Sequence, residues 1–228
     1  MALALQANPV VAWFLRHKCP EAAGWLDRLQ TLEAGDASDP RAVYAAEQSV
    51  LQMLNDWLVY VVDPSVYDAQ PFLAWDSREL SDLVDFSGQV VLDIGAGTGR
   101  LAFVAAPAAQ AVFCVEPVGN LRRYILEKAG RLGYKNVFAA EGLITQIPFP
   151  DSFAGVTMGG HVFGEFPEQE CDELERVTRP AGMVILCPGS SDREGDSHQV
   201  LVRRGYQWSR FEEPRDGWKR KYWKVMQK

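Results

Sequence analysis

The chain has 228 residues, of which 47% are hydrophobic and 23% charged, and its formal net charge is −7. This length suits one medium domain or a domain with a cap, and the composition is that of a globular protein. The negative charge argues against a surface devoted to nucleic acid, and no apolar run approaches the roughly 20 residues that cross a membrane. The apolar opening residues lack the basic stretch of a signal peptide, so we expect a cytoplasmic protein.

The cysteines and histidines show no metal-ligand spacing. None of the four cysteines forms a Cys-x-x-Cys pair, and the three histidines are far apart in the sequence. Structural zinc sites usually take their ligands in close pairs. We therefore expect no metal site.

Residues 1–75 are predicted to form a helical N-terminal cap region. Asp39 supplies an N-cap and Pro40 the first position of a long helix. Its apolar residues recur at spacings of three and four, which predicts one apolar face: Val43, Ala46, Val50, Leu54, Trp57 and Val61. Pro64 ends the helix, because proline disfavours helical geometry in the residue before it. Residues 64–75 hold several prolines and aromatic residues and are predicted to be a connecting loop.

Residues 76–228 alternate between apolar strands and amphipathic helices, after a short helix capped by Asp76. Strands are predicted over 89–93, 111–115, 136–140, 153–158 and 183–187, with helices over 100–108, 118–132 and 168–178. Such alternation is typical of a parallel sheet covered by helices on both faces. Residues 207–212 and 219–226 flank a turn-rich connector and are predicted to form an antiparallel hairpin at the sheet edge.

The C-terminal hairpin region is basic, in contrast to the rest of the chain. Residues 203–228 carry nine Arg or Lys and three Asp or Glu. One interpretation is a strip that binds a phosphate-bearing substrate. The other is an edge strand whose charges prevent aggregation.

The most informative stretch is the glycine-rich segment VVLDIGAGTGR, residues 90–100. An apolar strand runs into three alternating glycines and then into a helix. Glycine permits the positive φ angles of such a turn and lets a ligand approach the backbone. The start of the helix offers free N–H groups and a partial positive charge. The segment therefore predicts a cofactor-binding loop.

Two common phosphate-binding loops do not match this segment. A P-loop requires Gly-Lys-Ser/Thr at its end, whereas Gly99 is followed by Arg100. A dinucleotide fingerprint requires a small residue three positions after Gly97, where Arg100 stands. Glu116 ends the next strand, 23 residues after Asp93, and an acid there can accept hydrogen bonds from both ribose hydroxyls. The pattern favours a nucleoside cofactor of another kind.

In this pattern the sequence resembles the class I S-adenosylmethionine-dependent methyltransferases. VVLDIGAGTG is similar to the first motif of that family, Glu116 to its ribose-binding acid, and FAAEGLITQIPFPDSFAGV to its adenine-side segment. LERVTRPAGMVILCPG is similar to the segment that enters its fifth strand. The resemblance covers about residues 76–228 and implies a Rossmann-like α/β domain with a mostly parallel seven-stranded sheet that binds S-adenosylmethionine. It implies these cofactor-binding residues: Asp93, Gly95, Ala96, Gly97, Gly99, Glu116, Pro117, Glu141, Gly142, Leu143 and Gly160.

Two positions depart from the family pattern. Glu141, the adenine-side acid, lies seven residues before Pro148, which is more than the usual spacing, and Ala154 stands where the family has Asp. The adenine contacts are therefore expected around Glu141, Gly142 and Leu143 without a sharper assignment.

The residues that face the methyl acceptor are expected after the fourth strand, in residues 159–166. Ligands of open α/β sheets bind beyond the carboxyl ends of the strands. Methyl transfer from a sulfonium needs aligned reactants and exclusion of water, and it needs a base only if the acceptor must lose a proton. His161 and Glu165 are candidates for that base or for holding the acceptor, and Phe163 is a candidate for the pocket wall. The alternative for His161 and Glu165 is a capping role at the next helix.

Aromatic residues of the N-terminal cap region are candidates for the acceptor pocket. Tyr67 and Trp75 lie just before the cofactor domain and are the ones expected to face a flat or cationic acceptor. The alternative is that such residues form the core.

Four functions remain open at this point. The first is a methyltransferase with a small-molecule acceptor, and the second a methyltransferase that acts on protein or RNA through the basic C-terminal strands. The third is a cofactor-binding regulatory subunit without catalysis. The fourth, a nicotinamide-dependent oxidoreductase, is disfavoured by Arg100.

Overall fold

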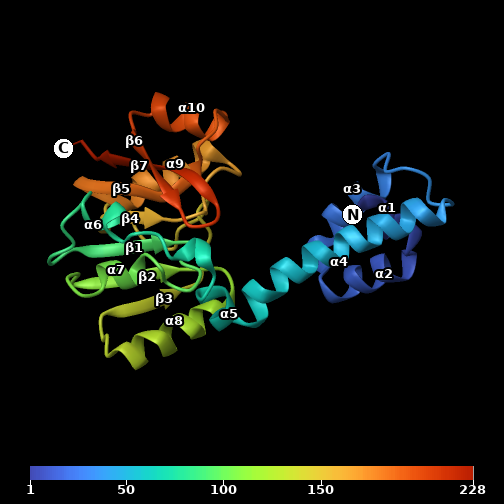
Figure 1. The fold of residues 1–228 in the computed structure, drawn as a ribbon, viewed down its shortest axis with the longest axis horizontal. Helices are drawn as coiled ribbons and strands as arrows, with labels where there is room; N and C mark the ends of the chain where they lie inside the picture. The colour runs from blue at the N-terminus through green and yellow to red at the C-terminus, as the bar shows by residue number, and fades with distance from the viewer. Residues whose placement is uncertain (228) are drawn as a thin grey trace. The chain divides into compact units, whose positions relative to one another are not determined.

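A computed structural model describes residues 1–227, with side chains for all of these except Glu21 and residues 55–60. The chain divides into two compact units, Met1–Tyr60 and Val61–Lys228 (Figure 1). Residues 61–75, which the sequence analysis grouped with the N-terminal helices, belong to the second unit. The side chain of Trp57, predicted for the apolar face of the long helix, lies outside the described residues.

The first unit is helical. Its elements are α1 (Ala2–Ala7), α2 (Pro9–Lys18), η1 (Pro20–Ala22), α3 (Ala23–Thr31) and the first part of α4 (Pro40–Val62). The Oδ1 atom of Asp39 accepts a hydrogen bond of 2.9 Å from the backbone N–H of Arg41, which agrees with its predicted role as a helix cap. None of the described helices is both long and apolar enough to span a bilayer.

The segment between the long helix and the sheet contains short helices rather than the predicted loop. These are α5 (Pro64–Asp68), η2 (Pro71–Leu73) and α6 (Arg78–Ser81). Asp63 starts α5 by accepting hydrogen bonds from the backbone N–H groups of Ser65 and Val66. The segment is held to the rest of the second unit by residues 119–132. The Asp68 carboxylate contacts Lys128 Nζ at 2.8 Å and accepts a hydrogen bond of 2.9 Å from the hydroxyl of Tyr124.

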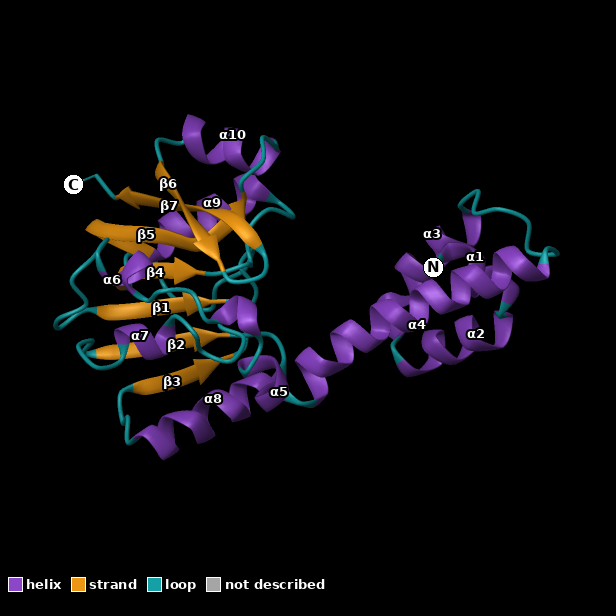
Figure 2. Cartoon of the chain, in the orientation of Figure 1, coloured by secondary structure: helices purple, strands orange, loops and turns teal. Residues whose placement is uncertain are grey.

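The second unit is built on a seven-stranded sheet in the order β3-β2-β1-β4-β5-β7-β6. The strands are β1 (Val90–Ile94), β2 (Ala111–Val115), β3 (Val137–Ala140), β4 (Ala154–Gly159), β5 (Thr178–Ser191), β6 (Gln207–Glu213) and β7 (Gly217–Val225). The first five pair in parallel, and β7 pairs antiparallel to both β5 and β6. The predicted fold class is confirmed. The chain order reverses between β1 and β4, and such a switch point is where open α/β sheets bind ligands (Figure 2).

Helices pack on both faces of the sheet (Figure 2). They are α7 (Ala102–Ala105), α8 (Gly119–Leu132), α9 (Pro167–Val177) and α10 (Asp196–Arg203). Alternate residues of β1 feed two separate cores, since Val91 belongs to one buried cluster and Leu92 and Ile94 to the other. The helix predicted over residues 100–108 is shorter, because turns occupy both of its ends, and α10 was not predicted.

Neither interpretation of the basic C-terminal strands is correct for β7. This strand lies between β5 and β6, so it is not the sheet edge. Lys219, Arg220 and Lys221 are only 5–8% exposed. Their cationic groups contact Asp216, Asp192 and Glu79 respectively, so the charges of this strand are used in internal ion pairs.

Candidate cofactor and acceptor site

The glycine loop leaves β1 in the geometry that its sequence predicts. Gly95, Gly97 and Gly99 have φ angles of +63°, +56° and +82°, which side chains rarely tolerate. The backbone N–H groups of Gly95 and Ala96 donate to the carbonyl of Val115 at 2.8 and 3.2 Å. The loop is therefore anchored to the end of β2, with Gly95 half-buried and the next four residues buried.

Glu116 lies at the end of β2 beside the glycine loop and is 1% exposed. Its Oε2 atom accepts a hydrogen bond of 2.9 Å from Gly97 N–H, and its Oε1 atom accepts one of 3.0 Å from Val118 N–H. Arg122 donates to the carbonyls of Glu116 and Pro117 at 2.7 and 2.8 Å. The chain thus holds an oriented carboxylate at the loop, where the resemblance expects the ribose-binding acid.

Asp93 fastens the other side of the loop. Its Oδ2 atom accepts a hydrogen bond of 2.9 Å from Ala102 N–H at the start of α7. Its Oδ1 atom is buried with no hydrogen-bond partner in the described part of the chain. Burial raises the pKa of Asp93 to about 7; the Ala102 hydrogen bond opposes this shift and the Glu116 charge adds to it.

We expect Asp93→Asn to change the pH dependence of stability. A carboxyl pKa raised on folding means that the native state binds the proton more tightly than the unfolded state. Its stabilising contribution is complete below pH 4 and is lost as pH rises to about 7, by up to about 4 kcal/mol. Relative to wild type, Asp93→Asn should therefore be more stable, with a larger free energy of unfolding, at pH 8 than at pH 5.

Urea unfolding at the two pH values measures this difference. The exposed Asp82, changed to Asn, is the matched control and should show the same difference at both. An equal difference for Asp93→Asn as well would show that Asp93 does not titrate in this range.

The residues expected to flank the adenine follow β3. Glu141 is exposed and contacts Arg122 at 2.7 Å, and Leu143 is 53% exposed. Gly142 is crowded, because an added Cβ would lie 2.6 Å from Pro148 Cδ and 2.8 Å from Val115 Cγ1. These three residues lie at the same sheet edge as Glu116, because β2 and β3 run in parallel.

The segment after β4 brings His161 to this edge in a constrained conformation. Its φ angle is +57°, and its backbone N–H donates to the carbonyl of Pro188 at 2.9 Å. Its Nε2 atom lies 2.8 Å from Glu213 Oε1. Gly160 packs closely, since an added Cβ would lie 3.0 Å from the carbonyl oxygen of Cys187. The backbone thus fixes the direction of the imidazole.

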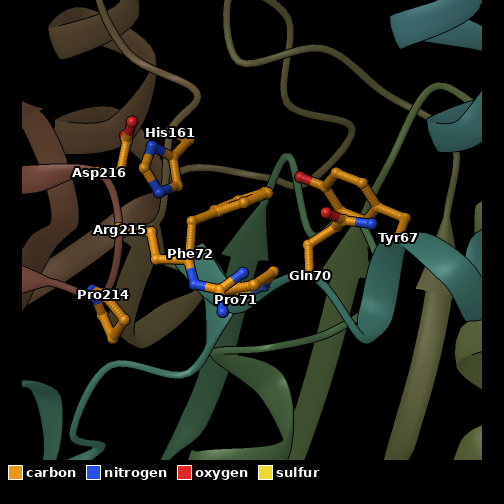
Figure 3. A pocket seen from close by; sticks show the side chains of 8 residues that line it. All are labelled: Tyr67, Gln70, Pro71, Phe72, His161, Pro214, Arg215 and Asp216. Carbon is orange, nitrogen blue, oxygen red and sulfur yellow. The ribbon is translucent and has the colours of Figure 1, made fainter.

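A cavity of about 620 Å³ opens beside His161 (Figure 3). The ring of Phe72 lies edge-on to both His161 and Tyr67, with centroid distances of 5.6 Å to each. The turn between β6 and β7 contributes further lining residues, Pro214, Arg215 and Asp216. An aromatic wall therefore faces a charged turn across a space of small-molecule size.

Tyr67 lines this cavity and is influenced by two buried carboxylates. Burial raises the pKa of the Tyr67 phenol to about 12, and the negative charges of Glu116 and Glu213 raise it further. The phenol therefore lies within the electrostatic reach of both carboxylates. Of the predicted acceptor residues, the structure brings Tyr67 and His161 together.

Three other predicted residues lie elsewhere. Trp75 is 3% exposed and packs in the core against Phe211, with its ring 4.4 Å from the Arg100 guanidinium carbon. Phe163 packs against a buried cluster. The Glu165 side chain is exposed, and its backbone N–H donates to Glu170. Arg100 holds Trp75 in this buried position, because its guanidinium donates a hydrogen bond of 2.6 Å to the Trp75 carbonyl.

The residues that the sequence analysis missed are Phe72, Glu213 and the turn that follows Glu213. The sequence marked Glu213–Gly217 as a turn, but only the pairing of β7 with β5 brings it beside His161. Among the described residues, no group of three or more His, Cys, Asp or Glu side chains is arranged to hold a metal ion.

Comparisons with known proteins agree with this arrangement. The methyltransferase domain family matches residues 91–182. An uncharacterized methyltransferase from Geobacillus thermodenitrificans is 31% identical over 164 residues, which are 68% of this chain and 74% of the relative. A demethylmenaquinone methyltransferase from Clavibacter sepedonicus is 31% identical over 136 residues, 58% of this chain and 52% of the relative.

The solved structures share the fold. A SAM-dependent methyltransferase from Aquifex aeolicus superposes with a TM-score of 0.53 at 19% identity, over 71% of this chain and 97% of that one. The chain spans between 47% and 74% of the length of the curated relatives it matches.

Proposed function

Because this chain belongs to the class I S-adenosylmethionine-dependent methyltransferases, we propose that it transfers a methyl group from S-adenosylmethionine to a small-molecule acceptor. The observation that carries the proposal is the aromatic cavity lined by His161, because His161 follows β4, one of the two strands at the switch point of the sheet. His161 lies in the wall of that cavity.

The residues present fit S-adenosylmethionine. Gly95, Gly97 and Gly99 form the sharp turn that such a cofactor needs, and Glu116 presents a buried, oriented carboxylate suited to ribose hydroxyls. Glu141, Gly142 and Leu143 would flank the adenine, and Gly160 would lie near the methionine part. When bound, this cofactor supplies an activated methyl group on a sulfonium. The chain itself aligns the acceptor and excludes water.

A small-molecule acceptor is favoured over a protein or an RNA. The cavity volume of about 620 Å³ lies within the range of small-molecule pockets. The basic residues of β7 are internally paired, which argues against a phosphate-binding strip there. Three relatives carry the name demethylmenaquinone methyltransferase, and another carries the name cypemycin N-terminal methyltransferase. His161, which lines the cavity, is the candidate base.

The first experiment is calorimetric titration with S-adenosylhomocysteine and, separately, with NADH. We expect micromolar binding of S-adenosylhomocysteine alone. Glu116→Ala should weaken it by about 100-fold, because a buried carboxylate that pairs with two hydroxyls contributes a few kcal/mol. The exposed Glu127 of α8, changed to Ala, is the matched control and should bind like wild type.

Binding of NADH without S-adenosylhomocysteine would contradict the proposed cofactor. Binding of S-adenosylhomocysteine that is unaffected by Glu116→Ala would leave the cofactor in place and overturn the role of Glu116.

A further inference from the structure

Glu213 is a fully buried carboxylate at the end of β6, and it faces the imidazole of His161. Its side chain is 0% exposed, and its Oε1 atom lies 2.8 Å from His161 Nε2. Its other oxygen, Oε2, lies 3.5 Å from Lys219 Nζ. Burying a carboxylate away from water costs free energy unless the carboxylate is paired. His161, Glu213 and Lys219 therefore form a charge cluster around this buried carboxylate.

The cluster points an oriented imidazole at the cavity. His161 is fixed from its backbone by the carbonyl of Pro188 and from its ring by Glu213, and Phe72 packs edge-on against the same ring. Its side chain is still 33% exposed, and it lines the cavity (Figure 3). A ring that is held at one nitrogen and still accessible is suited to proton transfer at the other.

The other charged groups around His161 belong to the same turn and to the aromatic wall. Asp216, which pairs with Lys219, interacts electrostatically with the imidazole. Arg215 lines the cavity, as does Tyr67 of α5, whose phenol has its pKa raised in part by the charge of Glu213. The imidazole therefore has two carboxylates near it, with Lys219 pairing with both of them.

We propose that Glu213 positions His161 as the general base of the methyl transfer, and that the acceptor is a flat aromatic molecule whose attacking oxygen carries a proton, such as a phenol. This inference rests on the proposed function. With the Nε2 proton donated to Glu213, the lone pair on Nδ1 is the basic site of the ring. Glu213 acts through His161 and does not touch the acceptor.

The step balances in atoms and charge. The acceptor O–H bond breaks and its proton moves to His161, while the oxygen forms a bond to the methyl carbon. The bond between that carbon and sulfur breaks, and its electron pair stays on sulfur. The positive charge that sulfur loses appears on the imidazole, next to the buried carboxylate of Glu213, where it is stabilised.

The acceptor class follows from the same chemistry. A nucleophile with a free lone pair, such as a pyridine nitrogen, attacks without losing a proton and gains nothing from a base. A phenol gains from proton removal, and its flat ring fits the wall of Tyr67 and Phe72.

The pairing is tested first, without any acceptor, by ¹⁵N NMR of the histidine side chains at pH 8.5. The His161 signals are assigned from the spectrum of His161→Gln. We expect the proton on Nε2 in wild type and in Glu212→Gln, whose exposed side chain on the same strand is the matched control. Glu213→Gln should show a mixture of the two tautomers, and an unchanged tautomer there would overturn the positioning role.

The chemistry is tested with two-ring probes of equal size, 1-naphthol and quinoline, and methyl-labelled S-adenosylmethionine. Wild type should methylate 1-naphthol at a rate that rises with pH to a plateau. In Glu213→Gln we expect kcat to fall by about 100-fold with KM unchanged. The pH at which the rate reaches its plateau should also differ from that of wild type. Glu213→Asp, which keeps the charge, should recover part of the rate. A merely structural role of Glu213 would change kcat and KM together and would leave the pH profile of the rate where it is in wild type.

The outcomes separate this inference from the proposed function. If S-adenosylhomocysteine does not bind, the proposed function fails. If it binds and 1-naphthol is not methylated, or quinoline is methylated faster, the acceptor class is wrong. Melting curves of each variant confirm folding, and the Glu213→Asp variant decides the result if Glu213→Gln is unfolded.

Discussion

Replacement of Gly95 by Ala is expected to weaken the binding of S-adenosylhomocysteine by about 100-fold or more. Gly95 has a φ angle of +63°, which costs a residue with a Cβ about 1–2 kcal/mol. The added Cβ would also lie 2.4 Å from Val162 Cγ2, so either the glycine loop or the segment after β4 must move. Both border the proposed cofactor site, and a displacement of about 1 Å there removes several contacts at once. Calorimetric titration measures the loss.

Gly88 provides the matched control for this substitution. It has a similar φ angle of +69°, but nothing lies within 4 Å of an added Cβ. Gly88→Ala should therefore lose stability by about 1–2 kcal/mol and keep its affinity for S-adenosylhomocysteine. Val162→Ala in the Gly95→Ala background removes the closest clash and should restore part of the binding. Equal affinities of Gly95→Ala and wild type would show that the loop does not border the ligand.

The centre of the sheet could be predicted closely because β1, β2 and β4 are both buried and short. The predicted strand over residues 111–115 coincides with β2, and the other strand predictions overlap their observed strands. A central parallel strand is covered on both faces, so its apolar run is continuous and stands out between polar turns. The glycine loop was predictable for a related reason, since three alternating glycines at a strand end have few other structural uses.

The acceptor side could not be predicted in the same way. Tyr67 and His161 were identified, but Glu213 and Phe72 reach the cavity only through the order of the strands, which a single sequence does not reveal. Trp75 was expected to face a ligand because it lies in the predicted loop just before the cofactor domain. Its burial depends on Arg100, which hydrogen-bonds two backbone carbonyls 25 and 27 residues earlier in the chain. Contacts of this kind leave no local pattern.

The cysteines show that a local pattern can predict burial when the position of a residue does not depend on a distant partner. Cys114 and Cys187 lie in apolar runs of the sequence, and both are buried in the same core cluster. Burial raises the pKa of Cys187 to about 12, so this thiol is neutral at physiological pH.

Lys219→Met is expected to lower the free energy of unfolding by about 2–4 kcal/mol. Lys219 is the cation nearest to Glu213 Oε2, and both side chains are almost without solvent, at 9% and 0% exposure. Removal of one partner of a buried ion pair leaves a charge that water cannot reach, which costs more than the pair itself contributes. The remaining contact between Glu213 and His161 reduces this cost. The expected loss of stability is therefore smaller than the largest losses found when buried ion pairs are broken. Chemical unfolding at pH 8 measures it, with the exposed Lys135→Met as the matched control.

The double variant Lys219→Met with Glu213→Gln separates the charge from the packing. A neutral amide at position 213 no longer needs a cation, so the double variant should be more stable than Lys219→Met alone, by about 1–3 kcal/mol. If the two substitutions instead destabilise additively, Lys219 contributes through its contact with Asp216 and through the packing of its methylene groups. In that case the buried carboxylate would depend on His161 alone, and His161→Gln would become the variant with the largest loss of stability in this cluster.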